Sequence, residues 1–397
     1  MLPEFQRKFA DQYYSEDKYT RFLKELDIEV GMHIEYRVCE MPIFVSNTFR
    51  KVLEDSAVAV ALECMTPSHL AASDGSLKPQ HTVPNQNEKP LFVIVDFALS
   101  VDEHGNYIPK VVELQGFPSL FGYQFLLAKK LKQFYKFDQT FSHTFSNLTD
   151  NEYIQLLHKA IIGTHDPDET CLLEYQPEKQ KTRPDFLSMK RLIGVEETDI
   201  CGVKLEGNRL FHKRNGKWVQ IKRIFNRAII DELEENNVQI PFSWTDDLDV
   251  EWAGHPNWYF RISKYSLPFL THKSVPKSIF LNTLDGIPDD LDNYVLKPLF
   301  SFAGKGVIIN PTPDDIRSIS NEQRGNYVLQ ERITYAESIY TPMGMNKVEL
   351  RIMMIWLGEW DAPVPVMSLA RTGRGPLMGA RYNSIEWTGA NGCLFGE

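Results

Sequence analysis

The sequence of 397 residues has few cysteines and no pairing pattern among them. Its five cysteines are widely separated, and no C-x-x-C pair occurs. This argues against a disulfide framework or a structural zinc site, and it predicts a reducing compartment. The chain also lacks an apolar run of about 18 residues, the length needed to cross a bilayer, and its first residues contain no apolar segment typical of a secretory signal. We therefore expect a cytoplasmic protein with no membrane partner.

Basic residues are fewer than acidic ones. The chain carries 53 acidic against 43 basic residues, a formal net charge of −10. A field of that sign repels nucleic acid, so we expect no nucleic-acid partner. The 43% hydrophobic and 24% charged residues are typical of a globular protein. Its length predicts two or three packed units.

Several common catalytic motifs are absent. The sequence has no H-E-x-x-H zinc motif, no G-x-S-x-G elbow and no G-x-x-x-x-G-K-[ST] phosphate loop. Gly304-Lys305-Gly306 lacks the hydroxyl residue that a phosphate loop of that kind needs. His69 and His255 are interpreted as structural.

The order of apolar patterns indicates a mixed α+β protein. Residues 1 to about 70 repeat apolar side chains every three or four positions, which is typical of helices. Residues 91–99 and 107–115 are predicted strands joined by a glycine-containing turn, a hairpin. The segment 153–249 alternates helical and strand patterns, which favours a small α/β domain. The last third of the chain is predicted to be mostly strands.

A candidate nucleotide site lies in the segment YVLKPLFSFAGKGVII. Lys297 is on a predicted strand, and Lys305 follows eight residues later between Gly304 and Gly306. Glycines let a backbone approach phosphates closely, and lysines supply positive charge for them. The alternative is a hairpin turn with solvated lysines.

Two further strands carry polar residues in apolar surroundings. YVLQERI ends in Gln330 and Glu331, and such a strand end can read an adenine edge and ribose hydroxyls. KVELRIMMIWL carries Glu349 and Arg351 two positions apart, hence on one face. A buried arginine needs a partner, so we expect either an ion pair with Glu349 or a phosphate.

The hairpin near residue 100 offers ligands for a hard metal ion. Asp96 lies on its first strand, and Glu113 and Gln115 lie on the return strand. Carboxylate and amide oxygens are the ligands that Mg²⁺ prefers. A solvated hairpin is the alternative, but Asp96 follows FVIV and Glu113 follows KVV, so both lie beside apolar stretches.

Taken in this order, these motifs resemble the ATP-grasp superfamily in a circularly permuted form. The chain is similar to glutathionylspermidine synthetase and related carboxylate–amine ligases over about residues 90–125 and 250–397, and more loosely over 170–250. The resemblance implies that ATP binds between two lobes, with Mg²⁺ held by the hairpin. It departs at Gln115, where the family has asparagine, which puts a second Mg²⁺ in doubt.

The resemblance also implies a division of the chain. Residues 1–88 form a mainly helical N-terminal segment, 89–150 the metal-binding hairpin with a helix, 151–250 a domain like the one that precedes the ATP-grasp lobes, and 251–397 those lobes.

Arginines complete the predicted site. Arg223 and Arg227 are four positions apart, so on a helix both face one anionic substrate; a solvated basic surface is the alternative. The glycine-rich tail contributes Arg371 and Arg381, and together with Arg351 they are candidates to stabilise a transferred phosphoryl group. The family pattern places one arginine before the hairpin and does not choose between Arg371 and Arg381.

The predicted function is an ATP-dependent ligase with ATP and Mg²⁺ as cofactors and small-molecule carboxylate and amine substrates. The carboxylate takes the γ-phosphoryl group, and an amine then displaces phosphate from the acyl phosphate. Two alternatives remain open, a small-molecule kinase that uses the same ATP site and a non-catalytic nucleotide-binding protein.

Overall fold

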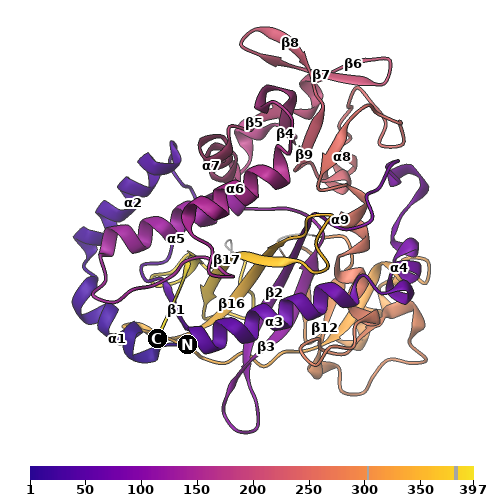
Figure 1. Ribbon diagram of the computed structural model, residues 1–397. Coiled ribbons are helices and arrows are strands. Elements are labelled where there is room, and N and C mark those ends of the chain that lie inside the picture. Colours follow the sequence, from indigo (N-terminus) through magenta and orange to yellow (C-terminus); the bar gives the residue numbers. More distant parts are fainter. Residues whose placement is uncertain (302–303, 380–382) are drawn as a thin grey trace.

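The structure is a computed structural model that describes residues 1–301, 304–379 and 383–397 (Figure 1). Its first third is rich in helices, as the apolar repeats predict. The α-helices are α1 (Pro3–Lys8), α2 (Glu16–Val30), α3 (Asn47–Glu63), α4 (Pro67–Ser73), α5 (Phe121–Tyr135), α6 (Asp150–Ile161), α7 (Arg183–Ile193), α8 (Ile230–Glu235), α9 (Asn257–Arg261) and α10 (Pro313–Arg317). Among the described residues, no helix is both long and apolar enough to pass through a bilayer.

The strands fall into five sheets. They are β1 (Ile43–Ser46), β2 (Phe92–Val101), β3 (Tyr107–Gln115), β4 (Thr170–Glu174), β5 (Glu196–Asp199), β6 (Lys204–Glu206), β7 (Arg209–Arg214), β8 (Lys217–Gln220), β9 (Arg223–Asn226), β10 (Glu251–Ala253), β11 (Ser278–Phe280), β12 (Tyr294–Pro298), β13 (Ile308–Ile309), β14 (Tyr327–Glu331), β15 (Ile339–Thr341), β16 (Gly344–Ile355), β17 (Val364–Gly373), β18 (Gly389–Asn391) and β19 (Cys393–Gly396). The mixed α+β class is confirmed.

The largest sheet is antiparallel in the order β18-β17-β16-β2-β3, with β15 also paired to β16. It joins the predicted hairpin, β2 and β3, to strands from the end of the chain. Successive side chains of a strand point to opposite faces. Val93, Val95 and Phe97 on β2 therefore pack in a core cluster that includes α3 residues, whereas Phe92 and Ile94 pack in one that includes α5 residues. Asp96 lies on the second face.

A smaller antiparallel sheet in the order β11-β14-β12-β13 has a core of its own. Leu296 of β12 is opposite Leu329 of β14, and both point into this core. Lys297 and Gln330 are the next residues on these strands, so their side chains leave by the other face. That face lies against β3, as hydrogen bonds from Lys297 and Gln330 to the backbone of β3 show.

A parallel sheet in the order β10-β9-β4-β5 forms the upper lobe in Figure 1, next to the exposed meander β6-β7-β8. Here Arg223–Asn226 forms the strand β9 between β4 and β10, so Arg223 does not lie on the helix on which a shared face with Arg227 depends. The segment pairs with the buried strand β4, and burial there overrides its helical spacing.

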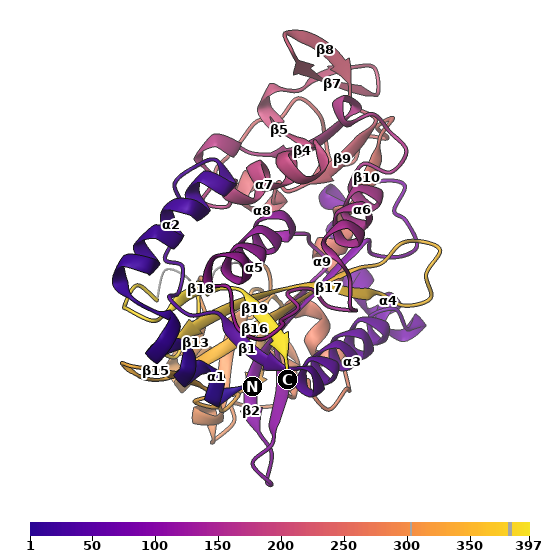
Figure 2. The ribbon, with the colours of Figure 1, turned by 60° about the vertical axis from the view of Figure 1, so that its left-hand side comes forward.

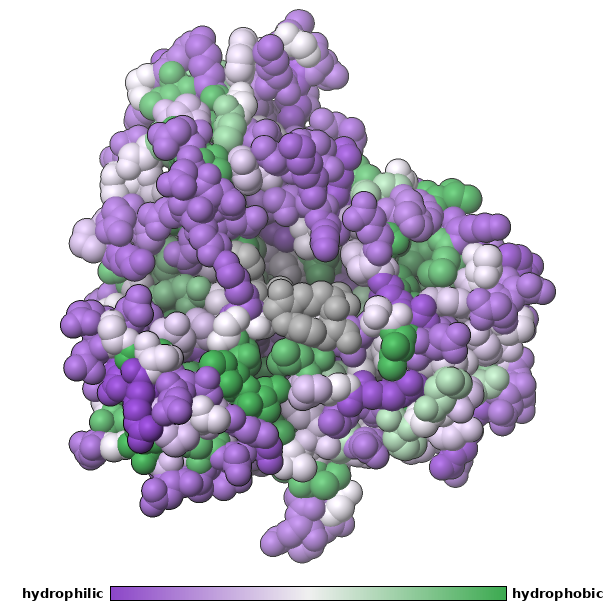
Figure 3. All heavy atoms as spheres, turned by 180° about the vertical axis from the view of Figure 1, so that it is seen from behind, coloured by the Kyte–Doolittle hydropathy of each residue, from purple (hydrophilic) through white to green (hydrophobic). Residues whose placement is uncertain are grey.

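The two ends of the described chain meet. Strand β1 pairs in parallel with β19, and Figure 2 shows both termini on the same side of the body. Seen from behind, the surface is largely hydrophilic and is hollowed between the upper lobe and the sheets below it (Figure 3).

Candidate functional site

Charged side chains follow one another across one face of the large sheet. Arg371 is opposite Glu349 in the β16–β17 pair, Arg351 is opposite Asp96 in the β16–β2 pair, and Asp96 is opposite Glu113 in the β2–β3 pair. The register of three strand pairs therefore brings together residues that are far apart in the sequence.

Asp96 is fully buried and holds two arginines. Its Oδ1 and Oδ2 accept hydrogen bonds from Arg351 Nε at 2.7 Å and Nη2 at 2.8 Å, and Oδ2 also accepts one from Arg371 Nη2 at 2.6 Å. Burial by itself raises the pKa of Asp96, but the two guanidinium groups outweigh it and hold that pKa below its usual value. Both carboxylate oxygens of Asp96, which the sequence predicts as a metal ligand, thus accept hydrogen bonds from arginine, and Asp96 links Arg351 to Arg371.

Glu113 and Gln115 differ from Asp96 because, among the residues that the structure describes, they form no short hydrogen bond with an arginine. The Gln115 amide donates to Glu113 Oε1 at 3.0 Å, and Arg351 Nη2 is 3.8 Å from the same oxygen. Glu113 is partly exposed. Of the three predicted metal ligands, these two present carboxylate and amide oxygens that are available to a cation.

Glu349 completes the charged row with partners that the sequence did not indicate. Its Oε1 accepts a hydrogen bond from the Tyr335 hydroxyl at 2.5 Å, and its Oε2 is 3.3 Å from Arg371 Nη2. Arg351 instead pairs with Asp96, so the expected ion pair with Glu349 is wrong. The two residues share a strand face, but Asp96 is the residue directly across the strand pair from Arg351. Burial raises the pKa of Glu349.

Lys297 is the residue that joins the small sheet to the hairpin. Its ammonium group donates to the Val112 carbonyl oxygen of β3 at 2.9 Å and to Gln330 Oε1 at 2.5 Å. The side chain is buried, and within the described part of the chain no carboxylate forms an ion pair with it. Burial lowers the pKa of Lys297 to about 8, although the nearby Glu113 raises it.

A second buried lysine lies beside the first, and the sequence analysis missed it. Lys264 donates to the Ser301 carbonyl oxygen at 2.5 Å, and its own burial lowers its pKa. Lys264 is close enough to Lys297 to lower that pKa further. It stands at the start of a 3₁₀ turn, Lys264–Phe269, and no glycine or strand motif marks it.

The glycine turn between β12 and β13 is placed at the exposed edge of the small sheet. Gly304 and Gly306 have positive φ angles of 71° and 73°, a conformation that glycine adopts without strain. The Lys305 side chain is 62% exposed and pairs with Glu235 of α8. Glu331 is also exposed, and its carboxylate accepts from the Lys277 amide, so only Gln330 of that strand end is buried in the site.

The remaining predicted arginines are spread over the molecule. Arg223 donates to the carbonyl oxygens of Ala160 and Ile161 and pairs with Glu251, away from the charged row. Arg227 is buried and pairs with Asp185 at 2.8 Å. Arg381 lies outside the described residues.

Arg227 nevertheless supports the site indirectly. Its partner Asp185 accepts hydrogen bonds from the backbone of Leu120, Gly122 and Tyr123, where α5 begins. The loop before this helix carries Ser119, whose hydroxyl accepts from Arg351 Nη1 at 3.1 Å. Arg227 therefore anchors the loop that leads from the Glu113–Gln115 strand to α5.

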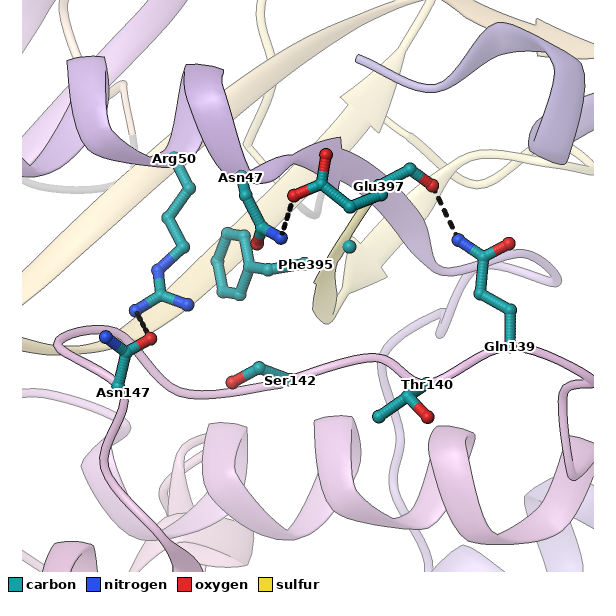
Figure 4. Close-up of a pocket in the computed structure, with 9 residues that line it drawn as sticks. Asn47, Arg50, Gln139, Thr140, Ser142, Asn147, Phe395 and Glu397 are labelled. Carbon is teal, nitrogen blue, oxygen red and sulfur yellow. Dashed lines mark hydrogen bonds between the residues drawn. The ribbon is translucent and has the colours of Figure 1, made fainter.

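Two cavities lie outside this cluster. One of about 410 Å³ is lined by Asn47, Arg50 and Glu397, among others, with Arg50 bound to Asn147 (Figure 4). The other, of about 680 Å³, includes Arg223 and Trp252. Neither is lined by the buried lysines or the charged row.

The arrangement of the chain is consistent with a glutathione synthetase-like fold. Among solved structures, the chain is similar to a glutathione synthetase-like effector, GSS30, from Globodera pallida in its apo form. The match has a TM-score of 0.61 at 11% sequence identity, and it covers 95% of this chain and 96% of the effector. No protein-family model and no curated protein matches the sequence.

Proposed function

We propose that the protein is an ATP-dependent carboxylate–amine ligase with a circularly permuted ATP-grasp fold. The fold likeness supports a ligase-like architecture. The observation that carries the proposal is the pair of buried ammonium groups, Lys297 and Lys264, facing the Glu113–Gln115 strand. Buried ammonium groups that bond only to neutral oxygens need an anion to balance them, and a polyphosphate supplies that charge.

The chain's own residues account for each requirement of phosphoryl transfer. Lys297 and Lys264 bind the phosphates, and Gln330 orients Lys297. Arg351 and Arg371, held in place by Asp96, stabilise negative charge on the transferred group. A substrate carboxylate oxygen attacks the γ-phosphorus while the bond to the bridging oxygen of ADP breaks. The amine nitrogen then attacks the acyl carbon, the bond to phosphate breaks, and the amine loses a proton.

The donor set on β3 fits a magnesium ion. Mg²⁺ commonly uses one or two protein oxygens and takes the rest from phosphates and water. Glu113 and Gln115 would hold it, and when bound it offsets the charge on the phosphate oxygens. Asp96 remains a positioning residue in this scheme.

Thermal unfolding with ATP and Mg²⁺, each alone and together, tests nucleotide binding. We expect stabilisation of the wild type that requires both ligands, and its loss in Lys297→Met. Lys159→Met is the matched control, because Lys159 forms an exposed pair with Glu359 on another surface. Equal stabilisation in the two variants would contradict the assignment of Lys297.

Product analysis then separates the reaction classes. A ligase releases ADP and free phosphate together with an amide, when carboxylate–amine pairs are supplied. A stable phosphoester would assign the site to a kinase instead. ATP binding without turnover for every pair tested would favour the non-catalytic alternative.

A further inference from the structure

A histidine and two carboxylates meet on the upper side of the molecule, separate from the charged row. His81 lies at the end of a 3₁₀ turn, Pro79–His81, and Asp231 and Glu234 lie on α8. Their donor atoms, one from each residue, are within 4.8 Å of one another, and His81 Nε2 is 2.6 Å from Glu234 Oε1. Asp231 and Glu234 are three positions apart, which places them on the same side of the helix.

The histidine is oriented toward this cluster and toward nothing else. His81 is 1% exposed and stacks on the Phe260 ring at 5.3 Å. Its other nitrogen, Nδ1, is buried without a hydrogen-bond partner. Outside the cluster the imidazole therefore has no polar partner among the residues that the structure describes.

Asp231 is short of positive charge. Its Oδ2 accepts one long hydrogen bond from the Tyr259 hydroxyl, at 3.3 Å. Within the described part of the chain, no lysine or arginine forms an ion pair with Asp231. A divalent cation between His81, Asp231 and Glu234 would balance both carboxylates.

We propose that His81, Asp231 and Glu234 bind a divalent transition-metal ion of the zinc type. One imidazole and two carboxylates form a mixed nitrogen and oxygen set, which suits Zn²⁺ and disfavours Mg²⁺ and Ca²⁺. Zn–N and Zn–O bonds of about 2.0–2.2 Å place neighbouring donors of a tetrahedron about 3.4 Å apart, so His81 and Glu234, now in direct contact, must separate slightly to admit the ion. Glu234 is 52% exposed and free to make that movement.

The site lies on an element that also contacts the glycine turn. Glu235, the next residue on α8, holds Lys305. The metal site is nevertheless independent of the proposed ligase activity, since none of its three ligands belongs to the charged row or the buried lysine pair.

Zinc titration by calorimetry tests the site. The background is Cys201→Ser, because Cys201 is an exposed free thiol and thiolates are zinc ligands. We expect about one equivalent of bound Zn²⁺, unaffected by millimolar Mg²⁺. Co²⁺ at the same site should give a visible absorption spectrum that Zn²⁺ abolishes.

Glu234→Gln is the informative variant, because a change at the buried His81 also disturbs its packing on Phe260. We expect Zn²⁺ affinity to fall about tenfold or more in Glu234→Gln. Glu232→Gln, which removes the same charge from the same helix outside the ligand set, should leave it unchanged. Absence of stoichiometric Zn²⁺, or equal affinity in the two variants, would reduce the cluster to an ordinary ion pair and overturn the proposal.

Discussion

The charged row of the large sheet and the buried pair of Lys297 and Lys264 differ in how their charges are partnered. In the row, each arginine contacts carboxylates directly, and Asp96 alone accepts three hydrogen bonds from guanidinium groups. Among the residues that the structure describes, Lys297 and Lys264 donate to carbonyl, amide and hydroxyl oxygens and to no carboxylate. The arginines of the row are paired directly within the protein, whereas the lysines have Glu113 only as a more distant carboxylate and would be balanced more fully by a bound anion. A ligand site is therefore expected on the lysine side, supported by a row that stays fixed.

The largest effect is expected from breaking the balanced row. Asp96→Asn removes the hydrogen-bonded carboxylate shared by Arg351 and Arg371 and leaves them only the longer contacts with Glu113 and Glu349, and breaking a buried pair of this kind typically costs about 3–5 kcal/mol of unfolding free energy. Urea unfolding measures it. Glu103→Gln, an exposed residue in the turn of the same hairpin, is the control and should change stability by less than about 0.5 kcal/mol. A small effect of Asp96→Asn would mean that water, and not Asp96, satisfies the arginine side chains of the row.

A smaller effect of opposite sign is expected on the lysine side. Lys297→Met removes an unbalanced buried charge, so the variant should be more stable than the wild type by about 1–2 kcal/mol at pH 7 in the absence of ATP. The same variant should lose ATP binding. Destabilisation of the size expected for Asp96→Asn would show that the protein itself balances the charge of Lys297, and the contrast between the two regions would fail.

The pH dependence sharpens this prediction. The folded-state pKa of Lys297, about 8, is below its ordinary value of 10.5. Below pH 8 both states hold the proton and the cost of burial is complete. Between pH 8 and 10.5 the unfolded state binds more protons, so this group makes stability rise with pH. Over this whole pH range, the pKa shift of Lys297 corresponds to about 3 kcal/mol of unfolding free energy. The stability advantage of Lys297→Met should therefore shrink between pH 7 and pH 10, measured by urea unfolding at each pH.

The smallest effect is expected at the exposed edge. Lys305→Ala removes a surface ion pair with Glu235, and such pairs contribute less than about 1 kcal/mol. The free energy of unfolding should be almost unchanged, and the small difference from the wild type should shrink further with added salt. If Lys305 also reaches the phosphates when ATP is bound, nucleotide-dependent stabilisation should fall in the variant while ligand-free stability does not. A large loss of ligand-free stability would show that the turn is part of the core.

The sequence by itself determined the local elements. Alternating apolar residues around Asp96 and Glu113 specified the hairpin β2–β3, and the four-residue apolar spacing specified the N-terminal helices. The sequence also indicated that Lys297 and Gln330 have polar partners, because a charged or polar residue in an apolar strand needs one.

Only the tertiary structure decided which partners these residues have. Strand register set Arg351 opposite Asp96 and left Glu349 to Tyr335 and Arg371, and register depends on pairing between distant segments. Packing between sheets buried Lys264, which has no local motif, and placed Arg223 in a strand despite its helical spacing. His81 and Glu234 are 153 positions apart, and no cysteine or histidine spacing relates them. Contacts of this kind arise from the fold as a whole, because the free energy of burial is shared by segments that no short window of sequence contains.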